Sequence, residues 1–210
     1  MNTIVVAGTD TGVGKTVFAA ALTGALGAHY WKPVQAGPDE DGGSDSLRVA
    51  RLAAVPDGHI LAEAYRLAAP CSPHRAAELD GVAIDPARLA LPRVEGSLVV
   101  EGAGGVLVPL TRERLYADQF AAWGAPVVLV ARTALGTINH TLLSLEALRA
   151  RGVAVLGVAF VGDENADSEA TIAQMGQVRR LGRLPHLAQI TSETLAAAFA
   201  ANFCVEEFRS

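Results

Sequence analysis

The residues best suited to chemistry lie at 8–16, where the chain reads GTDTGVGKT directly after the apolar run 3–7. Gly12 and Gly14 let backbone N–H groups turn toward an anion, and the start of a helix adds its partial positive charge. Lys15 can reach the outer phosphates of a nucleotide, and the Thr16 hydroxyl can ligate Mg²⁺. The stretch therefore predicts a phosphate-binding loop between a strand and a helix.

This loop departs at one position from the usual pattern G-x-x-x-x-G-K-[ST], because Thr9 stands where the pattern has its first glycine. The dinucleotide fingerprint G-x-G-x-x-G does not fit either, since Val17 occupies the place of its last glycine. The loop thus predicts nucleotide phosphate chemistry and argues against NAD binding.

Two acidic residues are candidate metal ligands. Glu101 closes the apolar run 97–101, and a carboxylate at the end of a buried strand can hold Mg²⁺ directly or through water. The glycine-rich residues 102–105 let the backbone approach a ligand. Asp45 is the second candidate, although Ser44 or Asp45 can equally be a plain N-cap of the helix that follows. The residues alone leave both readings of Asp45 open.

Lys32, within WKPVQ at 31–35, is a second candidate cation. It stands at what reads as a strand end, and the transition state of phosphoryl transfer is stabilised mainly by positioned positive charge. A solvent-exposed lysine is the ordinary alternative, and nothing in the neighbouring residues excludes it.

The residues LGTINH at 135–140 precede an amphipathic helix. Thr137 or Asn139 can cap that helix, and free N–H groups there can equally receive a carboxylate. His74 and His140 lack the Ser, Asp or Cys partners of a nucleophilic triad, so a hydrolase of that kind has no support.

The elements that must position these residues alternate between strand and helix. Runs rich in Val, Ile and Leu without polar alternation predict strands buried on both faces, at 3–8, 97–101, 126–131 and 153–161. Helical patterns occupy 14–27, 45–54, 115–123, 138–151 and 167–178. This order predicts an α/β P-loop NTPase-like fold, a mostly parallel, doubly wound sheet with helices on both faces. The loops at the carboxyl ends of the strands should converge on one site.

Composition narrows the class further. The chain has 210 residues, of which 50% are hydrophobic, so we expect one globular domain over residues 1–210. A formal charge of -5 without a basic run argues against nucleic acid, and the lack of an uncharged apolar run of about 18 residues argues against a membrane span. The start MNTIVVAGTDTG reads as a first strand and not a signal peptide. Cys71 and Cys204 lack metal-ligand spacing, which favours reduced thiols in a cytoplasmic enzyme.

Six motifs in order resemble those of the dethiobiotin synthetase family: GTDTGVGKT at 8–16, WKPVQAG at 31–37, SDS at 44–46, CSPH at 71–74, VEGAGG at 100–105 and LGTINH at 135–140. The resemblance spans the first two thirds of the chain, with a weaker echo in GRLP at 182–185. It implies a cyclo-ligase that forms C–N bonds. In that family CO₂ adds to one amine of 7,8-diaminopelargonate to give a carbamate, which attacks the γ-phosphate of ATP. The second amine then closes the cyclic urea of dethiobiotin and releases phosphate.

The resemblance also implies roles for individual residues. Thr16, Asp45 and Glu101 would hold Mg²⁺, while Thr11 and Lys32 would contact the diamine or carbamate, with Lys15 as a further catalytic cation. The nucleotide-binding residues would be Gly12, Val13, Gly14, Lys15, Thr16, Val17, Asp45, Glu101, Gly102, Ala103, Gly104, Gly162, Asp163, Leu184, Pro185 and His186. The remaining substrate-site residues would be Ala36, Gly136, Thr137, Ile138 and Asn139, the last four receiving the substrate carboxylate across the interface of a homodimer.

The chain departs from the family pattern at three positions. Ala36 replaces a hydroxyl residue near the substrate, so that contact is either absent or supplied by another group such as Gln35 or water. Gly12 replaces a commonly acidic residue. The strand ending at Gly162 and Asp163 lacks the asparagine that reads adenine in relatives, which leaves ATP as the default nucleotide and CTP as an alternative.

A partner-binding or switch ATPase of the related deviant P-loop class is the alternative function. Such proteins begin their loop K-G-G-V-G-K-T with a signature lysine, and this chain has Asp10 at the corresponding position. A glutamine-dependent amidoligase is a third class, but it needs a fused glutaminase domain for which 210 residues leave no room.

Overall fold

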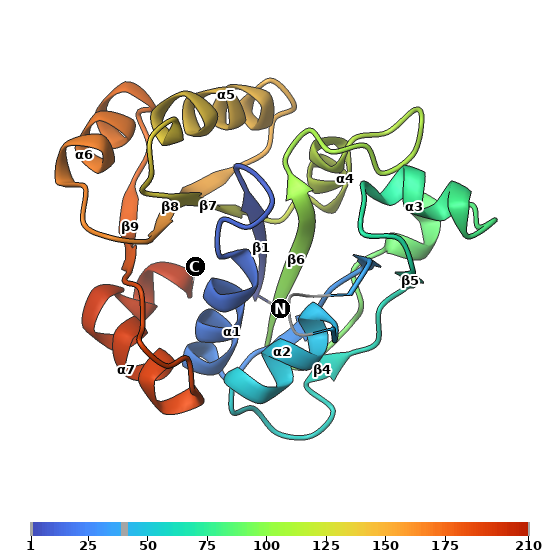
Figure 1. The fold of residues 1–210 in the computed structure, drawn as a ribbon, viewed down its shortest axis with the longest axis horizontal. Coiled ribbons are helices and arrows are strands. Elements are labelled where there is room, and N and C mark those ends of the chain that lie inside the picture. The colour runs from blue at the N-terminus through green and yellow to red at the C-terminus, as the bar shows by residue number, and fades with distance from the viewer. Residues whose placement is uncertain (1, 39–41, 210) are drawn as a thin grey trace.

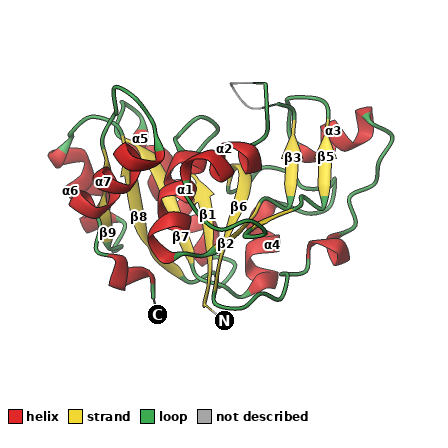
Figure 2. Cartoon of the chain, turned by 90° about the horizontal axis from the view of Figure 1, so that it is seen from below, coloured by secondary structure: helices red, strands yellow, loops and turns green. Residues whose placement is uncertain are grey.

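A parallel sheet of seven strands forms the centre of the protein in the computed structural model, which describes residues 2–38 and 42–209 (Figure 1). Its strand order is β4-β2-β6-β1-β7-β8-β9, and each strand runs parallel to its neighbours. These strands are β1 (Asn2–Gly8), β2 (His29–Trp31), β4 (Ile60–Leu61), β6 (Ser97–Gly105), β7 (Val127–Arg132), β8 (Val155–Val161) and β9 (Arg180–Leu184). A second, two-stranded parallel sheet of β3 (Val34–Ala36) and β5 (Tyr65–Leu67) stands beside it (Figure 2).

Helices cover both faces of the large sheet. One face carries α1 (Lys15–Leu26), α2 (Asp45–Leu52) and α7 (Ser192–Asn202), and the other carries α4 (Tyr116–Trp123), α5 (Thr137–Arg149) and α6 (Ala166–Met175). Helix α3 (Pro73–Leu79) packs against the small sheet, and two 3₁₀ helices, η1 (Pro86–Leu89) and η2 (Val205–Phe208), complete the order. No helix in residues 2–38 and 42–209 combines the length and apolar character needed to cross a bilayer.

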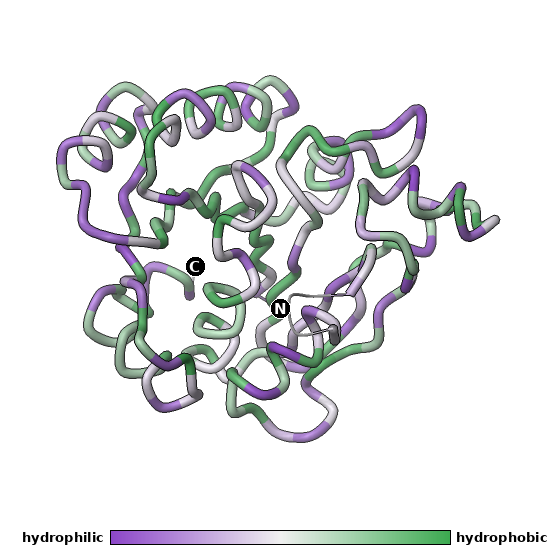
Figure 3. The backbone as a smooth tube through the Cα atoms, viewed as in Figure 1, coloured by the Kyte–Doolittle hydropathy of each residue, from purple (hydrophilic) through white to green (hydrophobic). Residues whose placement is uncertain are grey.

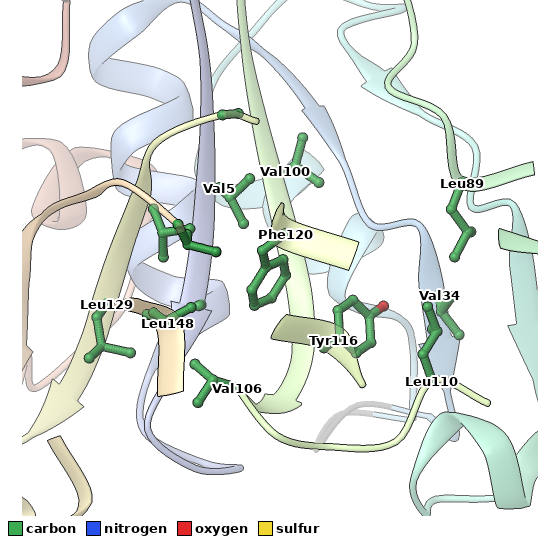
Figure 4. Packing of buried hydrophobic residues seen from close by; sticks show 14 of the residues in the cluster. Val5, Val34, Leu89, Val100, Val106, Leu110, Tyr116, Phe120, Leu129 and Leu148 are labelled. Carbon is green, nitrogen blue, oxygen red and sulfur yellow. The ribbon is translucent and has the colours of Figure 1, made fainter. Parts of the chain in front are cut away.

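The central strands are apolar throughout because each must fill two cores. Side chains alternate along a strand, so Ile4 and Val6 of β1 face the core that contains Phe18, while Val5 and Ala7 face the opposite core. On that second face Val5 and Val100 pack near Phe120, as Figure 4 shows. Figure 3 shows hydrophobic residues gathered along the central strands and hydrophilic ones mostly toward the outside. The sequence prediction of strands buried on both faces is confirmed.

The position of β1 determines where the site lies. From β1 the chain proceeds through α1 to β2 and then β4 on one side of the sheet, and only later returns with β6 directly beside β1. It then crosses to β7, β8 and β9 on the other side. In open α/β sheets the crevice for ligands lies at the carboxyl ends of the strands where the order reverses, here the ends of β1 and β6.

The predicted strands and helices are all present, with ends that differ by a few residues. Strands β3, β4, β5 and β9 and helices α3 and α7 were not predicted from the sequence. The strands among these span two to five residues, which is too short to show a periodic pattern. Helix α7 is rich in alanine, so the apolar stripe that identifies an amphipathic helix is weak.

An aromatic cluster attaches the C-terminal segment to α1. Phe208 is fully buried and lies near Phe18, Phe199 and Phe203, with ring centroids 5.9–6.4 Å away. Its backbone carbonyl also accepts a hydrogen bond of 2.7 Å from the Asn2 side chain at the start of β1. The helix that follows the phosphate loop is thus packed against the last described turn of the chain.

We predict that Phe208→Ala lowers the free energy of unfolding by about 3–5 kcal/mol, because it removes a fully buried ring and leaves a cavity. Urea denaturation measures the change. Met175→Ala is the control, since Met175 is 67% exposed and should change stability by less than about 0.5 kcal/mol. A loss below about 1 kcal/mol for Phe208→Ala would show that the cluster is not a rigid part of the core.

Candidate active site

The phosphate loop is shaped by two glycines with left-handed backbone. Gly12 has φ of 71° and Gly14, the N-cap of α1, has φ of 89°, a conformation that side chains rarely adopt. These turns direct backbone N–H groups toward the start of α1, where an anion is favoured. Thr9 has no positive φ, and its N–H donates to the Val130 carbonyl on β7 at 3.0 Å. The loop therefore does not need a glycine at position 9.

Lys15 folds back over the loop from the first turn of α1. Its side chain is buried, and its Nζ donates to the Asp10 carbonyl at 2.8 Å. A Cβ atom on Gly8 would overlap the Lys15 side chain, which explains the glycine at the end of β1. Burial, together with the nearby charge of Lys32, lowers the pKa of Lys15 to about 8.

Glu101 is the centre of a buried polar cluster in the middle of β6, which continues past the expected end at Glu101 to Gly105. Its Oε1 accepts hydrogen bonds from Thr16 Oγ1 at 2.8 Å and Lys32 Nζ at 2.9 Å, and its Oε2 accepts one from the Tyr30 hydroxyl at 2.9 Å. Glu101 has no exposed surface. A carboxylate taken from water in this way needs such donors to remain charged.

Lys32 joins the two acidic candidates. Its Nζ lies 2.6 Å from Asp45 Oδ2 and 2.9 Å from Glu101 Oε1, and it also donates to the Gly102 carbonyl at 2.9 Å. Only 3% of Lys32 is exposed, so the alternative of an ordinary surface lysine is wrong. Burial disfavours its charge, but the carboxylates of Glu101 and Asp45 more than offset that effect and raise the pKa of Lys32.

Asp45 is turned into the cluster because its neighbour caps the helix. The Ser44 side chain accepts the N-cap hydrogen bond from the Leu47 N–H, which leaves the Asp45 side chain to accept from Thr16 Oγ1 at 3.1 Å. Ser44 is therefore the N-cap of α2, and Asp45 remains a candidate metal ligand. Burial opposes the charge of Asp45, yet Lys32 and the hydrogen bonds it receives lower the Asp45 pKa.

Three oxygens in this cluster suit a hard divalent cation. Thr16 Oγ1 lies within 3.1 Å of both Asp45 Oδ1 and Glu101 Oε1, so a hydroxyl and two carboxylates converge. Mg²⁺ takes oxygen ligands, is typically held by one or two carboxylates, and otherwise keeps water and phosphate oxygens. No group of three or more His, Cys, Asp or Glu able to hold a metal occurs in the described part of the chain. Thr16, Asp45 and Glu101 are the candidate metal centre because their oxygens converge.

Two cavities meet at the phosphate loop. One of about 500 Å³ extends from the loop past Lys32 and contains these predicted site residues: Thr11, Gly12, Gly14, Lys15, Thr16, Val17, Lys32, Ala36, Asp45, Glu101, Ala103 and Gly104. The other, of about 390 Å³, shares part of the loop and contains Gly12, Val13, Gly14, Val17, Gly162, Leu184, Pro185 and His186. The structure thus brings most of the predicted residues together, on two sides of one loop.

Other predicted residues line neither cavity. Gly102 contributes its carbonyl to Lys32, and Asp163 is exposed beside the second cavity wall. The predicted substrate-carboxylate residues 136–139 lie at the start of α5, outside both cavities. The expectation that Thr137 or Asn139 caps α5 is wrong, because Gly136 is the N-cap without a side-chain bond and the Thr137 hydroxyl donates to the Arg132 carbonyl.

Gln35, the group named as a possible substitute for the hydroxyl missing at Ala36, lines the same cavity and is held by two hydrogen bonds. Its amide oxygen accepts from the Asp45 N–H at 3.1 Å, and its amide nitrogen donates to the Gly37 carbonyl at 2.9 Å. Gln35 therefore positions Asp45. The sequence analysis missed this role and that of Tyr30, because a residue that acts through another leaves no motif.

The chain has only two lysines among its 17 Lys and Arg residues, and both lie in this cluster. The remaining 15 are arginines. An ammonium is a compact point charge, whereas a guanidinium is a wide planar fork. The two lysine ammonium groups of the chain thus both lie in the restricted space beside the two carboxylates and the phosphate loop.

The sheet order, the loop and the lysine–carboxylate cluster define a P-loop enzyme of the nucleotide-binding α/β class. Solved structures support the fold. The cell division ATPase MinD of Pyrococcus furiosus aligns with a TM-score of 0.55 at 14% identity, covering 100% of this chain and 99% of that one. The septum site-determining protein MinD of Pyrococcus horikoshii, a complex with Mg-ADP, gives a TM-score of 0.58 at 15% identity, covering 99% of this chain and 88% of that one.

Sequence comparison defines the family. Residues 2–194 match the family model described as an AAA domain. The ATP-dependent dethiobiotin synthetase BioD of Rhodopseudomonas palustris strain BisB5 is 67% identical over 98% of this chain and 96% of its own length. The protein of the same name from Novosphingobium aromaticivorans is 68% identical over 99% of this chain and 100% of its own length. The chain therefore belongs to the dethiobiotin synthetase family and is a ligase.

We predict that Tyr30→Phe lowers the free energy of unfolding by about 1–3 kcal/mol, because it leaves Glu101 Oε2 buried without its donor. Chemical denaturation without nucleotide or metal measures the change. Tyr116→Phe is a matched control, since Tyr116 is also fully buried but its hydroxyl has no hydrogen-bond partner among the described residues. Equal losses for the two variants would contradict a specific role for the Tyr30 hydroxyl.

Proposed function

We propose that this protein carries out the ATP- and Mg²⁺-dependent carboxylation and ring closure of 7,8-diaminopelargonate with CO₂ to give dethiobiotin, ADP and phosphate. The observation that carries the proposal is the position of Lys32. It lies in the same cavity as the phosphate loop and is fixed by Asp45 and Glu101, so a positive charge faces the space beyond the outer phosphates. The names of the relatives, ATP-dependent dethiobiotin synthetases, agree with this reaction.

The chemistry requires two anions to meet. One substrate amine adds to CO₂ and loses a proton, and the resulting carbamate oxygen attacks the γ-phosphorus of ATP while ADP leaves. Lys15 and Lys32 supply positive charge beside the transferring phosphoryl group and the carbamate. Such charge stabilises the transition state. The exposed hydroxyl of Thr11 faces the same cavity and is assigned to the carbamate or diamine.

Thr16, Asp45 and Glu101 would hold Mg²⁺, which neutralises phosphate charge when bound. Their oxygens already converge, and Tyr30 and Gln35 keep Glu101 and Asp45 in that arrangement. A hydrated cation would share these two carboxylates with Lys32, whose Nζ is already paired with both.

Ring closure requires less assistance from protein groups. The second amine of the same molecule attacks the carbamate carbon, and phosphate leaves from the mixed anhydride. A tethered nucleophile has an effective molarity that can reach about 10⁵ M, so the site mainly has to hold the diamine in a bent conformation.

The protein is further proposed to act as a cytoplasmic homodimer in which residues 136–139 meet the substrate carboxylate of the partner subunit. Gly136 and Asn139 are exposed, and the N-terminus of α5 carries no side-chain cap; the Thr137 N–H donates to the Ala134 carbonyl, while those of Ile138 and Asn139 can meet an anion. Sedimentation analysis that finds only a monomer at assay concentrations would remove this part of the proposal.

Purified protein is predicted to release phosphate from ATP only when diaminopelargonate and bicarbonate are both present, in step with the dethiobiotin formed. Phosphate release and product formation are measured in parallel, with each substrate omitted in turn. ATP hydrolysis that ignores both compounds would exclude the proposal and favour a switch ATPase. A series with CTP, GTP and UTP establishes the nucleotide preference.

Lys32→Ala is predicted to lower turnover by about 10³-fold or more while ATP affinity changes only a few-fold, because Lys32 is assigned to the transferring group and not to the bound nucleotide. Single-turnover kinetics and nucleotide-binding titrations separate the two effects. Thermal melting identifies any loss of fold caused by the unpaired carboxylates. Arg93→Ala, which removes a cation from an exposed position, is the control. Unchanged turnover would exclude Lys32 from the mechanism.

A further inference from the structure

The lining of the second cavity is mostly apolar. It lies across the phosphate loop from Lys32, with Val13 and Val17 on the loop side and Leu184 and Pro185 on the other. A ligand whose phosphates occupy the loop would extend either into this cavity or toward Lys32. Since the Lys32 side is assigned to the diamine, the nucleoside end of the nucleotide falls here.

The backbone of the cavity wall at Gly162 is already hydrogen-bonded. The Gly162 N–H donates to the Leu184 carbonyl at 3.0 Å, and the Gly162 carbonyl accepts from Arg183 Nη1 at 3.2 Å. Arg183 is held in turn by the buried carboxylate of Glu169, with its Nε 3.3 Å from Glu169 Oε1. Gly162 is therefore held in place, and its N–H is not available to a base.

No side chain fits at position 162, because Thr133 already fills that space. Gly162 has φ of 133°, and a Cβ atom built there would overlap Thr133 Oγ1. Thr133 follows β7, lines the cavity and is nearly buried, and its carbonyl is fixed by the Asn165 amide at 3.2 Å. No hydrogen bond to the Thr133 hydroxyl is formed within the described residues.

We propose that Thr133 is a specificity-determining residue whose hydroxyl contacts the nucleobase in this cavity, an inference that rests on the proposed use of ATP. A hydroxyl can donate and accept, so it can pair with the edge of a base. The other polar side chains of the cavity, Arg132 and His186, are more exposed and less restricted. Gly162 is required because it leaves room for Thr133.

The test compares Thr133→Val, which keeps the shape but removes the hydroxyl, with Thr133→Ser, which keeps it. Thr133→Val is expected to raise Kd and KM for ATP about 3- to 10-fold, the range for one lost hydrogen bond. The affinity for inorganic triphosphate, which has no base, should not change. The kcat at saturating ATP should stay within 2-fold, because the contact is equally strong in the ground state and the transition state. Thr133→Ser should restore ATP affinity.

Thr141→Val is the control, since Thr141 is fully buried, its hydroxyl has no partner in the described part of the chain, and it lies outside the cavity. Unchanged ATP affinity in Thr133→Val would overturn the inference. An equal loss of affinity for ATP and for triphosphate would also overturn it, because the effect would then lie in the phosphate loop. Wild-type protein that binds triphosphate but gains nothing from the nucleoside of ATP would also overturn it. Absence of any ATP binding by the wild type would instead contradict the proposed function.

Discussion

Two carboxylates and an ammonium group removed from water impose the constraint on which the rest of the structure depends. Separate burial of Glu101, Asp45 or Lys32 would cost several kcal/mol each, so each must be held against its partners at hydrogen-bonding distance. Three different segments have to meet for this to happen: Glu101 lies in the middle of β6, Lys32 follows β2, and α2 begins at Asp45. The sheet order that places β6 between β1 and β2 is what makes the meeting possible.

The supporting hydrogen bonds follow from the same constraint. Tyr30 lies one residue before the end of β2 and donates to the oxygen of Glu101 that faces away from Thr16 and Lys32. Gln35 fixes the backbone of Asp45 from β3, which explains why a short second sheet stands beside the main one. Each charged group is thus oriented before any ligand arrives, and preorganised charge is the form in which electrostatics is most effective in catalysis.

The fold and the contents of the first cavity followed from the sequence to a large extent. The apolar runs of β1, β6, β7 and β8 are long enough to indicate buried parallel strands, and the loop at 8–16 has a spacing tied directly to phosphate geometry. Lys32 and Asp45 had plausible alternatives, since exposure and capping depend on tertiary neighbours. Tyr30, Gln35 and Thr133 were not predictable, because their roles arise from contacts between residues distant in sequence or from the space that a glycine leaves. Of the two roles left open for Thr137 and Asn139, capping of α5 is excluded because Gly136 takes the N-cap position; residue types alone do not fix which residue has the cap conformation.

The scarcity of lysine has a practical consequence. Apart from the α-amino group, the only primary amines in the chain are the two in the site, since the other 15 of its 17 Lys and Arg residues are arginines. Isotopic labelling of lysine therefore reports on this one location without signals from the surface. Occupancy of the phosphate loop and of the space beside Glu101 can be followed as two separate signals in the unmodified protein.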